Sequence, residues 1–302
     1  MKSIAFATQP PTPVGIQSPV IPTNSHPSKV GHPAAPDLAA IKQRQQQTWA
    51  AGDFSVVAAR IVFSAEQLLE SADPKAGDRS LDVATGSGNA AIAAARRGCV
   101  ATGLDYVPAL LARGRLRAQA EHLEVTFIEG DAERLPFPDA SFDLVTSIYG
   151  VMFAPNHRLA ASELLRVCRP GGKIALASWT PEGSVGEMFR TVSRYLPPPP
   201  GLTPPSKWGD EAYLRELFGS GIRTIHSQVR QAIFRYISTD AYVEFFRTWF
   251  GPTIKAFEAL PEDRHPALTA DMAALARKYN RNGGDAPITM VGDYLETIIT
   301  RA

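Results

Sequence analysis

The chain has 302 residues, and its 31 lysines and arginines nearly balance 30 aspartates and glutamates, which gives a formal net charge of +1. This balance disfavours a nucleic acid partner, because such partners are held by an excess of basic side chains. No apolar run approaches the roughly 18 residues that span a membrane, and the amino terminus lacks the apolar stretch of a signal peptide. We therefore expect a cytoplasmic protein without a membrane span.

The chain contains two cysteines, Cys99 and Cys168. Both stand in apolar or strand-adjacent sequence and do not have the spacing of metal ligands. We interpret them as buried thiols in a reducing compartment, and we expect no metal site.

Residues 1–36 are rich in proline and have almost no periodic apolar pattern. Ordering a residue costs about 1–2 kcal/mol, and this stretch has little apolar surface to offset that cost. The sequence predicts a disordered tail over 1–36, with a proline-rich docking motif as the alternative. Residues 37–302 are expected to form one domain.

A helical segment is predicted over residues 37–78. Asp37 follows a proline and is a candidate N-cap for a helix through Trp49, and Asp53 is a candidate N-cap for a second helix. The second helix keeps a helical apolar period until Asp73-Pro74, which ends it.

Strands and helices then alternate, which is typical of a parallel sheet covered on both faces. The predicted strands lie near 79–84, 99–104, 124–129, 142–148 and 173–179.

Beyond the fifth strand the pattern changes. The sequence predicts, in order, a helix near 184–196, an extended proline-rich connector (197–205), a helix (210–218), a long strand (224–236), helical sequence (240–282) and a last strand (294–300). Gly251-Pro252 should kink or break the helical part.

The most informative turn lies in Leu81–Asn89, which reads Leu-Asp-Val-Ala-Thr-Gly-Ser-Gly-Asn. Its Gly-Ser-Gly lets a ligand lie close to the backbone at the start of a helix. Asp105 ends the next predicted strand, where it can accept hydrogen bonds from ribose hydroxyls. Nicotinamide-dependent enzymes share such a turn, but Ala91 stands where their third glycine is expected.

Three further elements follow in order: Gly130–Phe137, Ser141–Ser147 and Leu164–Ala177 with its Pro170-Gly-Gly172 turn. These three elements follow the Leu81–Asn89 turn and the strand that ends at Asp105. With all five in this order, residues 79–180 closely resemble the class I S-adenosylmethionine-dependent methyltransferases. The most similar branch is the small-molecule enzymes that include the ubiquinone and menaquinone C-methyltransferases. The resemblance implies a Rossmann-like, mostly parallel α/β sheet of seven strands with helices on both faces. Its last strand would insert antiparallel between the fifth and sixth.

The resemblance also implies S-adenosylmethionine as cofactor and a role for each matching position. Asp82 and the backbone of the turn would hold its methionine part, Asp105 its ribose, and Asp131 its adenine amino group. The full implied set is Asp82, Ala84, Thr85, Gly86, Ser87, Gly88, Asp105, Tyr106, Asp131, Ala132 and Ser147. Tyr106 would lie against the adenine, the Ala132 N–H would meet a ring nitrogen, and Ser147 would lie beneath the sulfonium. As alternatives, Asp82 could be a cap and Asp131 a turn former.

Methyl transfer asks little of side chains beyond positioning. If a base is used, His157 is the best candidate, because it follows the fourth strand near the expected methyl position. The alternative is a surface histidine at a helix start.

The acceptor pocket should be built by aromatic and apolar side chains outside the core. The candidates are Trp49, Phe54, Met152, Phe153, Trp179, Phe246 and Trp249. The stripe around Phe246 could instead be plain core. Ser147–Gly150 lacks the Asn/Asp-Pro-Pro-aromatic turn of enzymes that methylate nucleobase amines or glutamine side chains, which argues against those substrates.

The sequence therefore favours methyl transfer to a small, apolar or aromatic molecule at oxygen, carbon or nitrogen. One alternative is a non-catalytic S-adenosylmethionine-binding protein, since a fold persists without chemistry. A less favoured alternative is an NAD-dependent oxidoreductase, which the Asp131 element and the Pro170-Gly-Gly172 turn disfavour. The oligomeric state stays open.

Overall fold

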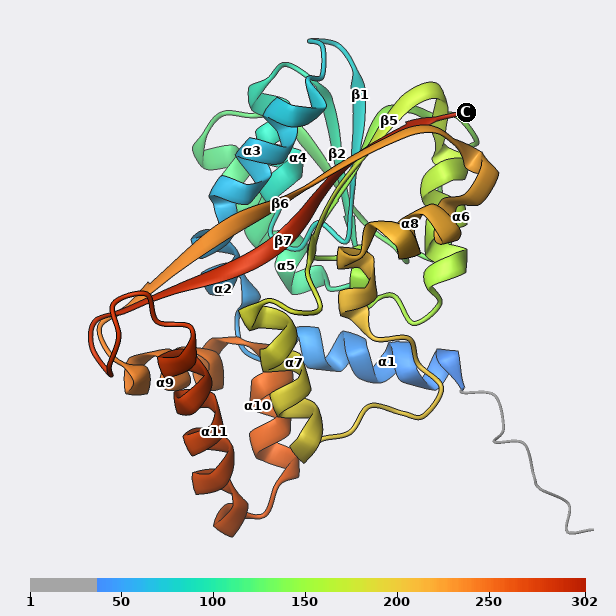
Figure 1. Cartoon of the computed structure of the whole chain (residues 1–302). Coiled ribbons are helices and arrows are strands. Elements are labelled where there is room, and N and C mark those ends of the chain that lie inside the picture. The colour runs from blue at the N-terminus through green and yellow to red at the C-terminus, as the bar shows by residue number, and fades with distance from the viewer. Residues whose placement is uncertain (1–36) are drawn as a thin grey trace, which may run out of the picture. The chain divides into compact units, whose positions relative to one another are not determined.

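A computed structural model of the chain describes residues 37–302. The tail predicted over residues 1–36 lies outside the described residues. Within 37–302, a central sheet carries helices on both faces and a further group of helices at one end (Figure 1). Among these residues, no helix is both long and apolar enough to cross a membrane.

The sheet has seven strands in the order β3-β2-β1-β4-β5-β7-β6. β7 pairs antiparallel with both of its neighbours, and all pairs among the first five strands are parallel. The predicted topology is confirmed. The strands are β1 Arg79–Val83, β2 Val100–Asp105, β3 Val125–Glu129, β4 Phe142–Ile148, β5 Cys168–Trp179, β6 Ile222–Tyr236 and β7 Ile288–Arg301.

Helices cover the sheet because its central strands are apolar on both faces. α3, α4 and α5 lie on one side, and α6 and α8 lie on the other (Figure 1). Leu81, Leu144 and Ile174 are almost fully buried between these layers. These helices are α3 Val62–Ala72, α4 Asn89–Arg96, α5 Pro108–Ala120, α6 His157–Val167 and α8 Glu211–Phe218.

The remaining helices gather beyond the carboxyl ends of the parallel strands (Figure 1). They are α1 Leu38–Trp49, α2 Phe54–Ala58, α7 Ser184–Tyr195, α9 Thr239–Trp249, α10 Gly251–Ala259 and α11 His265–Lys278. The last three form one insertion between β6 and β7. The expected break at Gly251-Pro252 is present, since α9 ends at Trp249.

The last strand is longer than the predicted 294–300. β7 pairs with β5 over Tyr294–Thr300 but with β6 from Ile288 onward. The extra residues form a two-stranded ribbon that reaches from the sheet to α9 (Figure 1). This ribbon connects the helical insertion to the core.

The capping predictions are confirmed, but the second predicted helix is not continuous. Asp37 accepts a hydrogen bond from Ala40 N at 3.1 Å, and Asp53 accepts one from Ser55 N at 3.0 Å. A 3-10 turn at Ala59–Ile61 divides α2 from α3, because Ile61 leaves helical geometry (φ −120°, ψ 15°). A second 3-10 turn, Pro205–Gly209, ends the proline-rich connector.

Candidate active site

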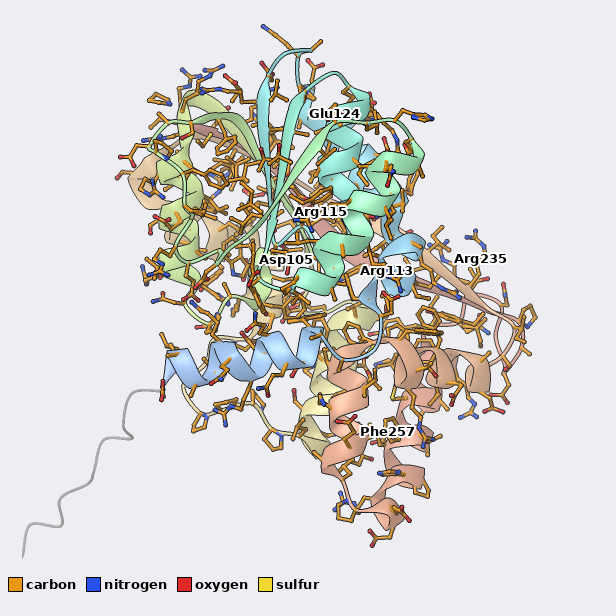
Figure 2. The ribbon with its side chains drawn as sticks, turned by 180° about the vertical axis from the view of Figure 1, so that it is seen from behind. Asp105, Arg113, Arg115, Glu124, Arg235 and Phe257 are labelled. Carbon is orange, nitrogen blue, oxygen red and sulfur yellow. The ribbon has the colours of Figure 1, made fainter. Side chains whose placement is uncertain are left out.

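A cavity enclosing about 870 Å³ of open space lies at the carboxyl ends of β1, β2 and β4. Its walls come from the turn after β1, the segment after β3 and helix α1. Figure 2 shows Asp105 at the end of the sheet that faces α1. The polar groups in the lining are Lys42, Gln45, Asp82, Thr85, Asn89, Asp105, Asp131 and Glu133.

The turn after β1 takes a backbone shape that favours glycine. Ala84, Gly86 and Gly88 all have left-handed φ angles, of 55°, 56° and 86°. A Cβ on Gly88 would lie 2.8 Å from the ring of Phe127, so this position has no room for a side chain. The turn delivers its backbone directly to the cavity.

Asp105 holds that turn in place. Its carboxylate accepts hydrogen bonds from Gly86 N at 2.8 Å and from Val107 N at 2.9 Å. The side chain is 6% exposed, and burial raises its pKa above the usual range. Each oxygen keeps a further lone pair for a ligand, because a carboxylate can accept about four hydrogen bonds.

Asp82 is the second buried acid. Its carboxylate accepts from the hydroxyls of Thr85 at 2.5 Å and Thr146 at 2.9 Å. Burial raises the pKa of Asp82 to about 6, although the two hydroxyls oppose that shift. Asp82 lies within the cavity lining.

Helix α1 closes over the cavity through two side chains. Lys42 Nζ lies 2.6 Å from Asp131 Oδ2 and 2.6 Å from Glu133 Oε2, and Gln46 Nε2 donates to the Tyr106 carbonyl at 2.5 Å. Sequence reasoning missed Lys42 and Glu133. Glu133 stands two residues after the expected Asp131, but nothing local signals Lys42.

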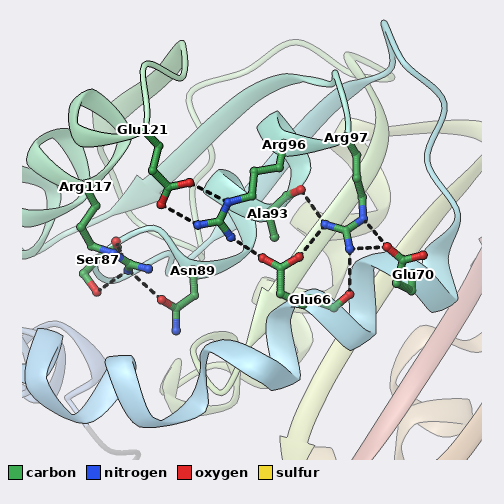
Figure 3. A network of polar contacts seen from close by, with 9 residues as sticks. All are labelled: Glu66, Glu70, Ser87, Asn89, Ala93, Arg96, Arg97, Arg117 and Glu121. Carbon is green, nitrogen blue, oxygen red and sulfur yellow. Dashed lines mark hydrogen bonds and ion pairs between the residues drawn. The ribbon is translucent and has the colours of Figure 1, made fainter.

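Ion pairs behind the turn join the three helices that support it. Arg117 of α5 donates to the Ser87 carbonyl and to Asn89 Oδ1, both at 2.7 Å. Arg96, the last residue of α4, and the following Arg97 pair with acids of α3 and with Glu121, which follows α5, as Figure 3 shows. Arg117 therefore fixes the start of α4 beside the turn, and the ion pairs of Arg96 and Arg97 hold the opposite end of α4 against α3.

A second cavity, with about 610 Å³ of open space, adjoins the first. The two share Trp49, Phe54, Ile61, Tyr149 and Phe153 in their linings. The rest of the second lining is almost wholly apolar: Val57, Trp179, Ser184, Val185, Met188, Phe189, Phe234, Tyr242, Phe246, Phe250 and Met290. It lies between the amino-terminal helices, α7, α9 and the β6–β7 ribbon.

Tyr149 is one of the five residues that line both cavities. Its ring stacks on Trp179 with centroids 3.8 Å apart and planes 4° apart. Its hydroxyl lies 3.0 Å from Ser64 Oγ. Its φ of 54° is rare for a bulky side chain, and such strain persists only where the surroundings hold it.

This chain is similar in sequence to a known protein family and to known proteins. Residues 81–176 match the methyltransferase domain family. An uncharacterized protein of Mycobacterium tuberculosis is 39% identical to this chain over 245 residues. The aligned region covers 79% of this chain and 89% of the mycobacterial protein. The chain belongs to the class I S-adenosylmethionine-dependent methyltransferases.

Two further similarities cover less sequence or only the fold. A demethylmenaquinone methyltransferase of Thermus thermophilus is 38% identical over 146 residues, which are 47% of this chain and 66% of that enzyme. The crystal structure of the YcgJ protein from Bacillus subtilis superposes with a TM-score of 0.55 at 23% identity, covering 80% of this chain and 99% of that one. The first agrees with a methyltransferase core, and the second shows that the fold is shared.

The first cavity of this methyltransferase brings together most of the expected cofactor positions. Asp82, Ala84, Thr85, Gly86, Asp105, Tyr106, Asp131 and Ala132 line it. Ser87, Gly88 and Ser147 do not. The Ser147 hydroxyl donates to the Val83 carbonyl at 2.7 Å and accepts from Val151 N at 2.9 Å, so it joins two strand ends.

The second cavity brings together five of the seven expected acceptor residues: Trp49, Phe54, Phe153, Trp179 and Phe246. Met152 is fully buried in the core and lines neither cavity. Trp249 is 37% exposed and lies outside both linings. Of these two residues of α9, Phe246 therefore lines the cavity and Trp249 lies at the surface.

His157 lies in neither lining, and it is not a surface residue either. It is the first residue of α6, 5% exposed, with Nδ1 2.9 Å from the Tyr213 hydroxyl and its ring against Trp208. Burial lowers the pKa of His157 to about 4. A backbone hydrogen bond with Met152 raises this pKa, but by less than burial lowers it. The imidazole packs against Tyr213 and Trp208 and lines neither cavity.

A buried neutral His157 makes the protein sensitive to acid. Because its pKa falls from 6.5 to about 4 on folding, its contribution to stability is present above pH 6.5 and is lost as pH falls toward 4. Between pH 7 and 4.5 we expect the wild type to lose about 2–3 kcal/mol more unfolding free energy than His157→Gln. Denaturant unfolding of both proteins at the two pH values measures this difference. Equal losses would show that His157 titrates normally.

Proposed function

We propose that this methyltransferase binds S-adenosylmethionine in the first cavity and methylates a small, apolar or aromatic molecule held in the second. The observation that carries the proposal is the charge of the first cavity, where four carboxylates and one ammonium group line the carboxyl ends of the parallel strands. Open α/β sheets bind their ligands at this edge.

The charge of the first cavity distinguishes between S-adenosylmethionine and a dinucleotide as the cofactor. S-adenosylmethionine carries a sulfonium and an ammonium against one carboxylate, so an acidic cavity suits it. A dinucleotide would instead place a pyrophosphate at the turn after β1. Asp82 lies there, and Lys42, the one cation among the described residues of the lining, is paired with Asp131 and Glu133. This arrangement supports the sulfonium cofactor over NAD.

The lining residues suit the parts of this cofactor. Asp105 would accept from the ribose hydroxyls, and Asp82 with the Ala84–Gly86 backbone would hold the methionine part. Asp131 and the backbone of Ala132 would bind the adenine, with Tyr106 beside it. Ser87, Gly88 and Ser147 would act indirectly, by shaping the turn and the strand end.

When bound, the cofactor supplies an electrophilic methyl group. The protein's part is to hold an acceptor in line and to exclude water, and such positioning can contribute about 7–11 kcal/mol. Tyr149 and Phe153 border both cavities, so the methyl group would pass between them. The proposal assigns no base, because His157 lies outside both linings.

The apolar second lining supports an apolar or aromatic acceptor. The Thermus relative acts, by its name, on demethylmenaquinone, but its similarity covers only about half of this chain. It supports a small-molecule acceptor.

Two measurements test the proposal. S-adenosylhomocysteine should raise the melting temperature in a concentration-dependent way, since a ligand that binds only the folded state stabilises it, and NAD should not. The reverse result would favour an oxidoreductase. Formation of S-adenosylhomocysteine with a metabolite pool from a cell lysate then separates an enzyme from a protein that only binds the cofactor.

A further inference from the structure

We propose that the acceptor is an aromatic molecule whose reacting oxygen or sulfur is already an anion at neutral pH, as in an acidic phenol or thiol. This inference deepens the function proposed above and depends on it. It rests on the composition of the second cavity and on the hydrogen bonds of its few polar groups.

The second cavity has no proton acceptor among the described residues that line it. The lining contains no carboxylate, imidazole, amine or thiol, and its aliphatic and phenolic hydroxyls belong to Ser184, Tyr149 and Tyr242. Ser184 Oγ donates to the Val291 carbonyl at 2.6 Å, and Tyr149 is paired with Ser64. Burial also raises the pKa of Tyr149 and of Tyr242 well above 10, so neither phenol ionises near neutral pH.

Charged side chains on the surrounding elements are directed elsewhere. None of them lines the second cavity. Partners in the structure include Asp131 and Glu133 for Lys42, the rings of Tyr236 and Phe245 for Arg60, Lys278 for Glu187, the Pro181 carbonyl for Arg190, Asp271 for Arg194, Glu296 for Arg230, Thr248 for Glu244, the ring of Phe257 for Arg247 and Gln231 for Asp293.

A neutral hydroxyl or thiol would have to lose its proton during transfer, and this lining offers no group to take it. An acceptor anion avoids the problem. It gives an electron pair to the methyl carbon, the bond from that carbon to sulfur breaks with its pair left on sulfur, and no proton moves. Opposite charges cancel in this step, so an apolar cavity favours it.

The same lining penalises an anion that has no cation beside it. Removing a charge from water without a partner raises the pKa of the acidic group. The protonation state of a bound phenol should therefore depend on whether the ligand in the first cavity carries positive charge at the methyl position.

The test uses 4-nitrophenol, whose anion is coloured. Its pKa is measured by absorbance when bound to the protein saturated with sinefungin, which has an amine cation at the methyl position, and with neutral S-adenosylhomocysteine. We expect the pKa of the bound phenol to be at least about one unit lower with sinefungin. Equal values with both ligands would overturn the proposal.

Binding controls separate the possible failures. Calorimetry first establishes that sinefungin and S-adenosylhomocysteine bind, and if neither does, the proposed function itself fails. If both bind but 4-nitrophenol does not, the inference alone fails.

A matched pair of variants on α9 locates the bound phenol. Phe246→Ala removes a lining side chain, and Trp249→Ala changes a side chain outside the lining on the same helix. We expect Phe246→Ala to weaken 4-nitrophenol binding about tenfold and Trp249→Ala to change it less than threefold. The opposite order would place the phenol outside the second cavity and overturn the proposal.

Discussion

Asp105→Ala is expected to weaken S-adenosylhomocysteine binding by at least about a hundredfold. The carboxylate would lose its bonds to the ribose, and a hydrogen bond to a charged group contributes about 1.5–3 kcal/mol, which is roughly ten- to over a hundredfold in affinity. The substitution would also remove the hydrogen bonds that the carboxylate accepts from Gly86 N at 2.8 Å and from Val107 N at 2.9 Å. The turn after β1 would then lose its shape as well as its ligand contact.

Calorimetric titration measures this effect, and Glu124→Ala is the matched control. Glu124 is an exposed carboxylate near the opposite end of the sheet from Asp105 (Figure 2). The control should bind like the wild type. An unchanged dissociation constant in Asp105→Ala would refute the assignment of Asp105 to the cofactor.

Deleting residues 1–56 is expected to lower the melting temperature by several degrees and to abolish most cofactor binding. The deletion removes Lys42 and Gln46, which join α1 to the core beside the first cavity. It also removes Trp49, whose ring packs edge-on against Phe153 and Phe250 at 4.8 and 5.7 Å between centroids. Both cavities would lose a wall.

Deleting only residues 1–36 is the control for that experiment. We expect a nearly unchanged melting temperature and cofactor affinity, because the sequence of 1–36 lacks the apolar surface to dock. Thermal unfolding with and without S-adenosylhomocysteine compares the two truncations. A loss of several degrees in the shorter deletion would show that the domain begins before residue 37.

The sequence alone predicted the features whose causes are local. Asp37 and Asp53 were recognisable as helix caps because each precedes a helical apolar pattern, and both accept the expected backbone hydrogen bonds. The order of the strands followed from the family resemblance. Left-handed Gly86 and Gly88 also agree with a turn that excludes side chains.

Features that depend on distant contacts could not be predicted. Lys42 meets Asp131 across 89 residues of chain. His157 follows the fourth strand as an active-site base could, but Tyr213, 56 residues later, covers it. Apolar spacing placed Phe246 and Trp249 in one stripe, and only the packing of α9 shows that the first faces a cavity and the second faces solvent.

The β6–β7 insertion has a consequence for how substrate preference could change. Residues 237–287 leave the sheet after Tyr236 and return at Ile288, and these two residues are register partners on neighbouring strands. A segment whose ends already lie side by side can be exchanged or lengthened with little strain on the rest of the fold. No residue of the insertion lines the first cavity, so such an exchange would keep the first cavity's own lining, provided that the replacement retains a partner for Trp49 in place of Phe250. Recombination at these two positions therefore offers a route to enzymes that keep one methyl donor and accept different molecules.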